Sequence, residues 1–139
     1  MVKKFKQVWR HRFILMVTFF YFPKSDVPHL GDVYRTTSFP IINIYNGGSL
    51  RGTIAALKIS IEIAGTNMKI MPRHGLEIVG RDELVSFRDT ILDIQNKVLT
   101  LIRESKKLDE FMIAKPTADY DSAWTSDPGW VSDDFIPLV

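Results

Sequence analysis

The histidine with the most informative sequence context is His74. It follows the segment Lys69–Arg73, in which a short apolar run stops at a proline, and it precedes Gly75. An apolar run that ends at Pro and Gly is typical of a buried strand that leads into a loop. An imidazole at a strand exit can bind a metal or carry a proton, because the strand fixes its position and the loop gives access. The alternative is a structural histidine held by hydrogen bonds.

A second strand-exit signal lies upstream, in His29-Leu30-Gly31-Asp32. In a regular strand, His29 and Asp32 would point to opposite faces, so we do not expect them to share a site. Gly31 lets the backbone bend and frees the carboxylate to turn into a cleft. Asp32 could instead be a turn residue that binds its own backbone. The candidate metal ligands are therefore Asp32 and His74.

Hydrophobic periodicity predicts the elements that position these residues. Period-2 or continuous apolar runs indicate strands, and apolar residues at i, i+3 and i+4 indicate helices. Ser49 is suited to cap the first helix and Gly65 to follow its end. The predicted strands are 13–22, 27–33 and 68–71, and the predicted helices are 49–64, 82–105 and 108–114, with a last short helix that Ser132 could cap. The sequence thus predicts an α/β fold.

Composition narrows the class of protein. The 139 residues are enough for one domain, 1–139, with 45% hydrophobic and 24% charged residues. The net charge of +2 gives no support for nucleic-acid binding, and the absence of cysteine excludes disulfides and thiolate metal sites.

The N-terminal region needs separate interpretation. Residues 1–12 are basic, and 13–22 are apolar and aromatic, which resembles a secretory signal. No small-residue cleavage site follows, however, and the run is shorter than the ~20 residues that span a bilayer. Its β-branched and aromatic content favours a buried strand. We therefore expect a cytoplasmic protein.

Several segments together resemble one family. The order begins with an aromatic strand, then the segment Phe22-Pro23-Lys24, then a strand that ends in His29-Leu30-Gly31-Asp32. The further matching segments are Phe39-Pro40-Ile41-Ile42, Gly47-Gly48-Ser49, Lys69 to Gly75, Leu84-Val85-Ser86-Phe87-Arg88-Asp89 and Ala114-Lys115-Pro116-Thr117-Ala118-Asp119-Tyr120-Asp121. Over 13–139 the chain resembles the C-terminal half of bacterial metallo-β-lactamase-fold metallo-hydrolases, in their zinc-hydrolase-like branch; residues 1–12 are unmatched.

The resemblance implies a fold and a site. The family forms an αββα sandwich of two halves, with one or two zinc ions at one edge. The resemblance therefore implies that this chain is one half of the sandwich, a mixed sheet with helices on one face. Asp32 falls on the carboxylate ligand that bridges the two metals, and His74 on the last histidine ligand. Carboxylate oxygen and neutral imidazole bind zinc at ~2.0–2.2 Å. Zinc lowers the pKa of its bound water toward ~7, which makes hydroxide available as a nucleophile.

The resemblance also implies weak or absent hydrolysis by this chain alone. The family's His-x-His-x-Asp-His motif is not in the sequence, and His11 is out of register with the next histidine ligand. Arg73 stands where the family loop usually has glycine, and its positive charge opposes a metal's charge. The resemblance assigns neither a catalytic residue nor a substrate. A second polypeptide could supply the missing ligands, or the chain could be a truncated gene product.

Half of a sandwich leaves one sheet face to be covered. Such a face is an interaction surface, and two-fold pairing is its commonest solution, so we expect a homodimer or higher oligomer. A non-catalytic dimeric binding or structural module on the same half-fold is the first alternative. The second, less favoured, is a small membrane-surface protein whose basic N-terminus and aromatic run lie on anionic lipid.

Overall fold

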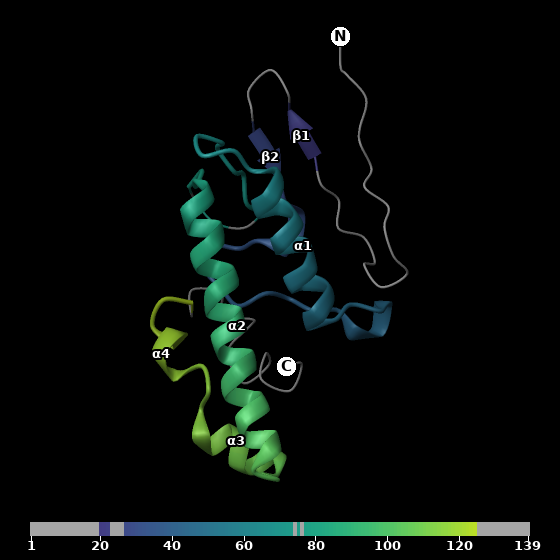
Figure 1. The fold of residues 1–139 in the computed structure, drawn as a ribbon, viewed down its shortest axis with the longest axis vertical. Helices are drawn as coiled ribbons and strands as arrows, with labels where there is room; N and C mark the ends of the chain where they lie inside the picture. The colour runs from purple at the N-terminus through teal and green to yellow at the C-terminus, as the bar shows by residue number, and fades with distance from the viewer. Residues whose placement is uncertain (1–19, 23–26, 74, 76, 125–139) are drawn as a thin grey trace.

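The computed structural model describes residues 20–22, 27–73, 75 and 77–124. Within these described residues, two short strands and four α-helices follow one another (Figure 1). The elements are β1 (Phe20–Phe22), β2 (Val27–His29), α1 (Leu50–Ile63), α2 (Arg81–Arg103), α3 (Leu108–Ala114) and α4 (Ala118–Asp121), with the 3₁₀ turns η1 (Gly31–Val33) and η2 (Ile44–Asn46). The described part is therefore a helix-rich mixture of helices and strands.

Helix α1 begins and ends where the sequence predicts. The Ser49 side chain accepts a hydrogen bond from the backbone N–H of Gly52 at 3.1 Å, which satisfies one donor of the first turn. The predicted apolar stripe is buried, with Ile54, Leu57 and Ile61 each no more than 7% exposed. Burying each of these side chains contributes about 1.5–3 kcal/mol, so packing rather than propensity holds the helix.

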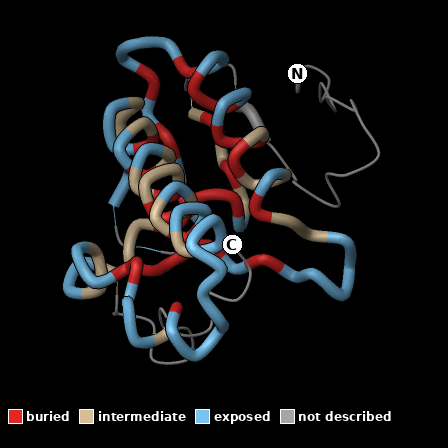
Figure 2. Tube along the Cα trace, turned by 60° about the horizontal axis from the view of Figure 1, so that its bottom comes forward, coloured by how far each residue is buried: buried red, intermediate tan, exposed pale blue. Residues whose placement is uncertain are grey.

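Helix α2 is the longest of the described elements and packs along α1. Glu83 accepts a hydrogen bond from the backbone N–H of Gly80 at 3.0 Å and so caps the start of the helix. Leu84, Ile91 and Ile94 are fully buried. Figure 2 shows the buried residues along the sides of the two helices that face each other. This contact forms the centre of the core.

The predicted strands are shorter in the structure. The second strand was predicted over 27–33, but β2 ends at His29, because Gly31 takes a φ of 55° and opens η1. In place of the strand predicted at 68–71, the structure has isolated β-bridges at Ile70 and Met71. β1 pairs with β2 antiparallel, and the rest of the predicted strand 13–22 lies outside the described residues.

The C-terminal elements were predicted in part. Helix α3 has the predicted bounds, and Lys115 ends it in a left-handed conformation with a φ of 43°. Helix α4 was not predicted. The ring of Trp124, just after α4, packs on Phe39 at 5.0 Å and on Phe87 at 4.9 Å between ring centroids. The predicted cap at Ser132 lies outside the described residues. None of the helices in the described part of the chain is long and apolar enough to cross a membrane.

Candidate functional site

Two segments that are far apart in the sequence run side by side in parallel. The N–H of Met71 donates to the carbonyl of Pro28 at 2.8 Å, and the N–H of Leu30 donates to the carbonyl of Met71 at 3.2 Å. His29 and Met71 form a parallel bridge. Because the two segments are parallel, the loops that follow them leave the bridge in the same direction.

An ion pair joins these two loops. The Nη1 atom of Arg73 donates to Oδ2 of Asp32 at 2.8 Å, and the two side chains are 57% and 49% exposed. At this exposure water screens the attraction, so the pair contributes no more than about 1 kcal/mol to stability. The structure therefore brings Asp32 beside the residue that precedes His74. His74 itself lies outside the described residues.

His29 has a local role in the same turn. Its Nδ1 atom accepts a hydrogen bond from the backbone N–H of Gly31 at 3.2 Å. Sequence reasoning separated His29 from Asp32 by strand alternation, but the strand ends at His29, so alternation does not apply to Asp32. The His29 side chain instead stays in its own turn, where it binds the backbone N–H of Gly31 at the start of η1.

The loop after Arg73 approaches the chain beyond η1. Gly75 has a φ of 126°, and a Cβ atom built on it would lie 1.8 Å from Oγ1 of Thr36. This close approach requires glycine, for steric as well as conformational reasons. The residues on either side of position 74 therefore both lie close to the chain around η1: Arg73 contacts Asp32, and Gly75 lies against Thr36.

A small hollow with aromatic and polar lining residues adjoins this loop through Thr36. Its volume is about 150 Å³. It is lined by Tyr34, Arg35, Thr36, Glu83, Ser86, Phe87 and Trp124. Burial, and secondly the negative charge of Glu83, raise the pKa of Tyr34 to about 12, so this phenol is a hydrogen-bond donor at neutral pH. The Nε atom of Arg35 donates to Oγ of Ser38 at 2.7 Å.

A zinc ion needs more protein ligands than the described residues of the Asp32 and Arg73 loops provide. A zinc site in a protein has three or four protein ligands. Within 20–22, 27–73, 75 and 77–124, no group of three or more His, Cys, Asp or Glu residues could hold a metal ion. Asp32 also lies against a guanidinium. The described residues alone therefore do not fit a zinc ion, and no hydrolytic step follows from them.

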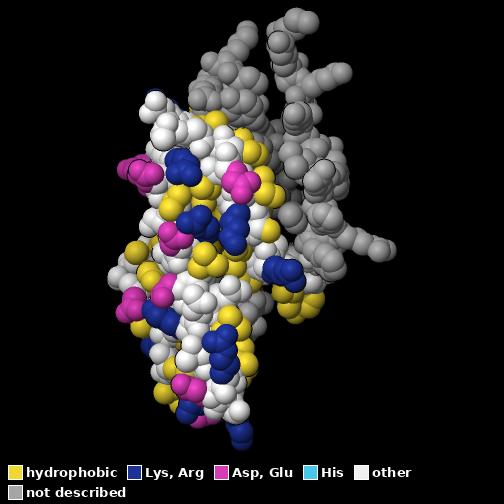
Figure 3. Space-filling view, viewed as in Figure 1, with side chains coloured by type: hydrophobic (Ala, Val, Ile, Leu, Met, Phe, Trp, Pro, Cys, Tyr) yellow, Lys and Arg dark blue, Asp and Glu magenta, His cyan; other side chains and the backbone are white. Residues whose placement is uncertain are grey.

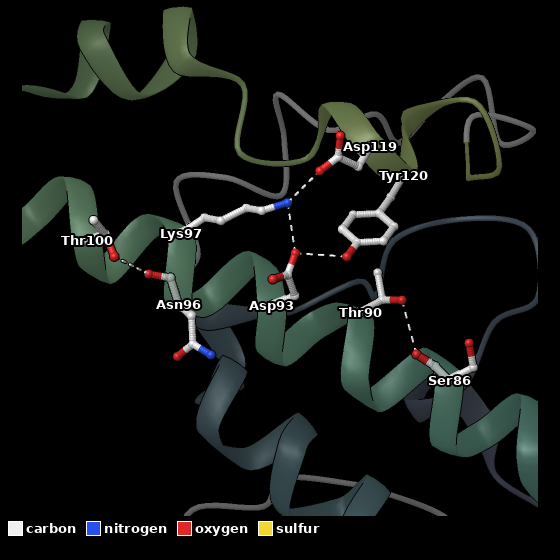
Figure 4. A network of polar contacts seen from close by, with 8 residues as sticks. All are labelled: Ser86, Thr90, Asp93, Asn96, Lys97, Thr100, Asp119 and Tyr120. Atoms are coloured by element: carbon white, nitrogen blue, oxygen red, sulfur yellow. Dashed lines mark hydrogen bonds and ion pairs between the residues drawn. The ribbon is translucent and has the colours of Figure 1, made fainter.

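Sequence reasoning missed a polar cluster that joins α2 to α4 (Figure 4). The Nζ atom of Lys97 contacts Asp93 at 2.8 Å and Asp119 at 2.7 Å. The hydroxyl of Tyr120 donates to the same oxygen of Asp93 at 2.8 Å, and Nζ of Lys97 lies 5.2 Å from the Tyr120 ring centroid. We call these four residues the Lys97 clamp. The i, i+4 spacing of Asp93 and Lys97 on a predicted helix was the available signal.

The clamp shifts the pKa values of its members. Hydrogen bonds from Lys97 and then Tyr120 hold the pKa of Asp93 below its usual value of 3.8. Hydrogen bonds to Asp119 and then Asp93 raise the pKa of Lys97 above its usual value of 10.5. The polar groups of the four residues bind one another, and the contacts of Asp119 and Tyr120 join α4 to α2. The clamp is therefore a structural anchor for α4.

Comparisons of the chain with models of protein families, with curated proteins and with solved structures found no match.

Proposed function

We propose that the chain is a metallo-β-lactamase-fold hydrolase-like protein in which Asp32 and His74 are two of the metal ligands. In this proposal the described helices and strands are half of the αββα sandwich. The observation that supports it is the parallel pairing of the segments before Asp32 and Arg73, whose following loops meet in an ion pair. Ligands that come from two such loops can approach one metal ion.

The same ion pair supports the view that the chain alone binds zinc weakly. A metal at Asp32 has to compete with the Arg73 guanidinium, which already lies 2.8 Å from the carboxylate. Two ligands are fewer than a zinc site needs, so the remaining ligands come from outside this pair. The chain alone therefore binds zinc weakly and hydrolyses substrates slowly or not at all.

Zinc binding is the direct test. The full chain is dialysed against zinc at neutral pH, and bound metal is measured by elemental analysis. Weak binding to the wild type is expected, with loss in Asp32→Asn and in His74→Ala and a gain in Arg73→Gly. Asp109→Asn and His11→Ala are matched controls that should retain wild-type binding. Equal zinc binding by the wild type, Asp32→Asn and His74→Ala would contradict the assignment.

A hydrolysis assay tests the second part of the proposal. Chromogenic lactam, lactone, thioester and phosphodiester substrates cover the reactions that this fold supports elsewhere. The zinc-treated wild type is expected to turn over none of them faster than Asp32→Asn. Turnover that depends on Asp32 would show that the chain alone is a competent hydrolase.

A non-catalytic dimeric module on the same half-fold is the second candidate. The pairing of Asp32 with Arg73 favours it, because the guanidinium already neutralises the carboxylate that a metal would bind. Absence of zinc binding in every variant, Arg73→Gly included, would select this candidate over the first.

A further inference from the structure

One apolar repeat continues from α2 into α3. Its positions alternate in steps of three and four residues, and all but one of them are apolar. They are Leu84, Phe87, Ile91, Ile94, Val98, Leu101, Ser105, Leu108 and Met112. Such a repeat is typical of one continuous helix, and residues 81–115 contain neither glycine nor proline. The sequence therefore favours a single helix where the structure has two.

The break between the two helices is strained. Ser105, just after α2, has a φ of 57°, and Lys115, just after α3, has a φ of 43°. A residue with a side chain is strained in this left-handed region, and glycine is the usual residue at such a helix end. The N–H of Lys107 donates to Oε2 of Glu110 at 2.9 Å, whereas in a continuous helix it would donate to the carbonyl of Arg103. Hydrogen bonding at Lys107 therefore gives the bend little advantage over a continuous helix.

Few apolar contacts hold α3 in its bent position. Phe111 is its buried residue, and it packs with Val98 in a small cluster apart from the main core. Leu108, which belongs to the repeat, is 57% exposed, and Ile113 is 82% exposed. Figure 3 shows hydrophobic side chains among charged ones at the end of the molecule that α3 and the last turns of α2 form. The bend therefore buries little of the apolar surface of α3.

The chain after α3 returns along α2 (Figure 1). We call residues 116–124 the strap. The Lys97 clamp joins the strap to α2, and the Trp124 ring packs on Phe39 and Phe87, which are 0% and 4% exposed. Trp124 also lines the hollow of about 150 Å³ beside Thr36. The strap therefore covers two core rings and one side of this hollow.

The closed strap and a continuous helix exclude each other. In one helix from 81 to 114, Ala114 would lie about 40 Å from Phe87, at about 1.5 Å per residue. Three residues connect α3 to α4, and α4 is helical, so the chain from Ala114 to Trp124 spans about 20 Å. Two aromatic side chains in contact cannot bridge the remaining distance of about 20 Å. A continuous helix therefore removes Trp124 from Phe87.

We propose that residues 104–124 are a switch with two positions. In the bent position, which the structure shows, the Lys97 clamp holds the strap against α2. In the straight position α2 continues to Ala114 and the strap is released, which uncovers Phe39 and Phe87 and opens the hollow beside Thr36. The straight position is a minor state of about 0.1–10% in the wild type. The switch uses no residue assigned to metal binding, so it is tested separately from the zinc proposal.

Paired spin labels measure the bend and the strap in the full chain. The chain has no cysteine, so one pair is placed at Asn96→Cys and Ile113→Cys, and the other at Asn96→Cys and Ala118→Cys. All three positions are exposed. The first pair flanks the contact of Val98 with Phe111, and it would be about 26 Å apart in a continuous helix. The second pair adjoins the ion pair of the Lys97 clamp with Asp119, so both distances are short in the bent position and long in the straight one.

Two substitutions should move the switch toward the straight position. Lys97→Met removes the clamp, and Ser105→Leu completes the repeat and disfavours the left-handed bend. Each should raise the ratio of straight to bent chains by about fivefold to tenfold, and the two together by about 50-fold. The double variant should therefore show roughly 5% or more of the long distance in both pairs. Ser105→Gly is the matched control, because it relieves the strain of the bend and should show the short distances alone.

Three results would overturn the proposal. The first is a folded double variant in which both distances stay short. The second is a longer distance from Asn96 to Ala118 with a short one from Asn96 to Ile113, because the strap would then open without straightening. The third is equal distance distributions for Ser105→Leu and Ser105→Gly, each combined with Lys97→Met. Ser105→Ala replaces Ser105→Leu if circular dichroism shows that the latter is unfolded.

Discussion

Replacing Lys97 by methionine should loosen α4 from α2. Methionine keeps the unbranched stem and a similar helix propensity, so the change removes the charge and little else. The structure gives Lys97 three interactions to lose: Asp93 at 2.8 Å, Asp119 at 2.7 Å and the Tyr120 ring at 5.2 Å. Trp124 follows this segment and packs on Phe87, so a weaker clamp also weakens an aromatic contact of the core.

The size of the effect follows from exposure. The Lys97 side chain is 35% exposed and that of Asp119 is 74% exposed, so both ion pairs are screened. An i, i+4 pair on a helix contributes about 0.3–0.5 kcal/mol, and an exposed pair across elements contributes about the same. An exposed cation–π contact adds about 0.5 kcal/mol. Lys97→Met should therefore lower the free energy of unfolding by about 1–1.5 kcal/mol and the Tm by about 3–5 °C.

Urea unfolding followed by tryptophan fluorescence measures this change. A double-mutant cycle with Asp119→Asn should give a coupling of about 0.5 kcal/mol, because the two residues touch. Lys106→Met is a matched control: Lys106 contacts Glu110 only four residues away. No loss of stability in Lys97→Met, or no coupling to Asp119, would refute the view that the clamp holds α4.

The clamp also predicts a pH dependence. The pKa of Asp93 is lowered in the folded state, so its contribution is present above pH 3.8 and is lost as the pH falls through the lower folded pKa. The pKa of Lys97 is raised, so its contribution is present below pH 10.5 and is lost as the pH rises through the higher folded pKa. The stability difference between the wild type and Lys97→Met should therefore be constant from about pH 5 to 9 and shrink below about pH 4. A difference that grows on acidification would contradict this sign.

Three further substitutions test the local arguments by urea unfolding. Gly75→Ala should cost about 2 kcal/mol or more, since its φ is 126° and its Cβ would meet Thr36, whereas Gly65→Ala, with no atom within 4 Å of the new Cβ, should cost nothing. Ser49→Ala removes the cap of α1 and should cost about 1 kcal/mol. Ile91→Ala leaves a cavity at a fully buried position and should cost about 3 kcal/mol. Equal effects of Gly75→Ala and Gly65→Ala would contradict the argument about Gly75. Unchanged stability in Ser49→Ala would contradict the capping argument, and unchanged stability in Ile91→Ala would contradict the cavity argument.

The helices were predictable because their signals are local. Each helix is predicted by residues within its own segment: the apolar period of α1, the apolar period of α2, and the Ser49 hydroxyl that caps α1. The structure confirms these three predictions. The strands were predicted too long, because one backbone angle at Gly31 ends β2 and no side-chain pattern reports it. Helix α4 has four residues, too few for a periodic pattern.

The contacts at the candidate site depend on distant residues. Gly31 was expected to let the backbone bend before Asp32, and its φ of 55° confirms that expectation. The partner of Asp32 could not be predicted, because Arg73 is 41 residues away and sequence alone does not specify which loops meet. Arg73 was interpreted only as a residue unfavourable to a metal. The structure shows that it also joins the two loops. That His74 is a metal ligand stays a prediction.

The central claim is that Asp32 and His74 lie together at the ends of two parallel segments. The chain has no cysteine, so a double variant with Asp32→Cys and His74→Cys carries the only two thiols. Dibromobimane, which becomes fluorescent when it bridges two neighbouring thiols, measures their proximity in the folded chain. The account predicts bridging in this variant and none in a control with Asp109→Cys and His74→Cys. Two reactive thiols at positions 32 and 74 that are never bridged would contradict it.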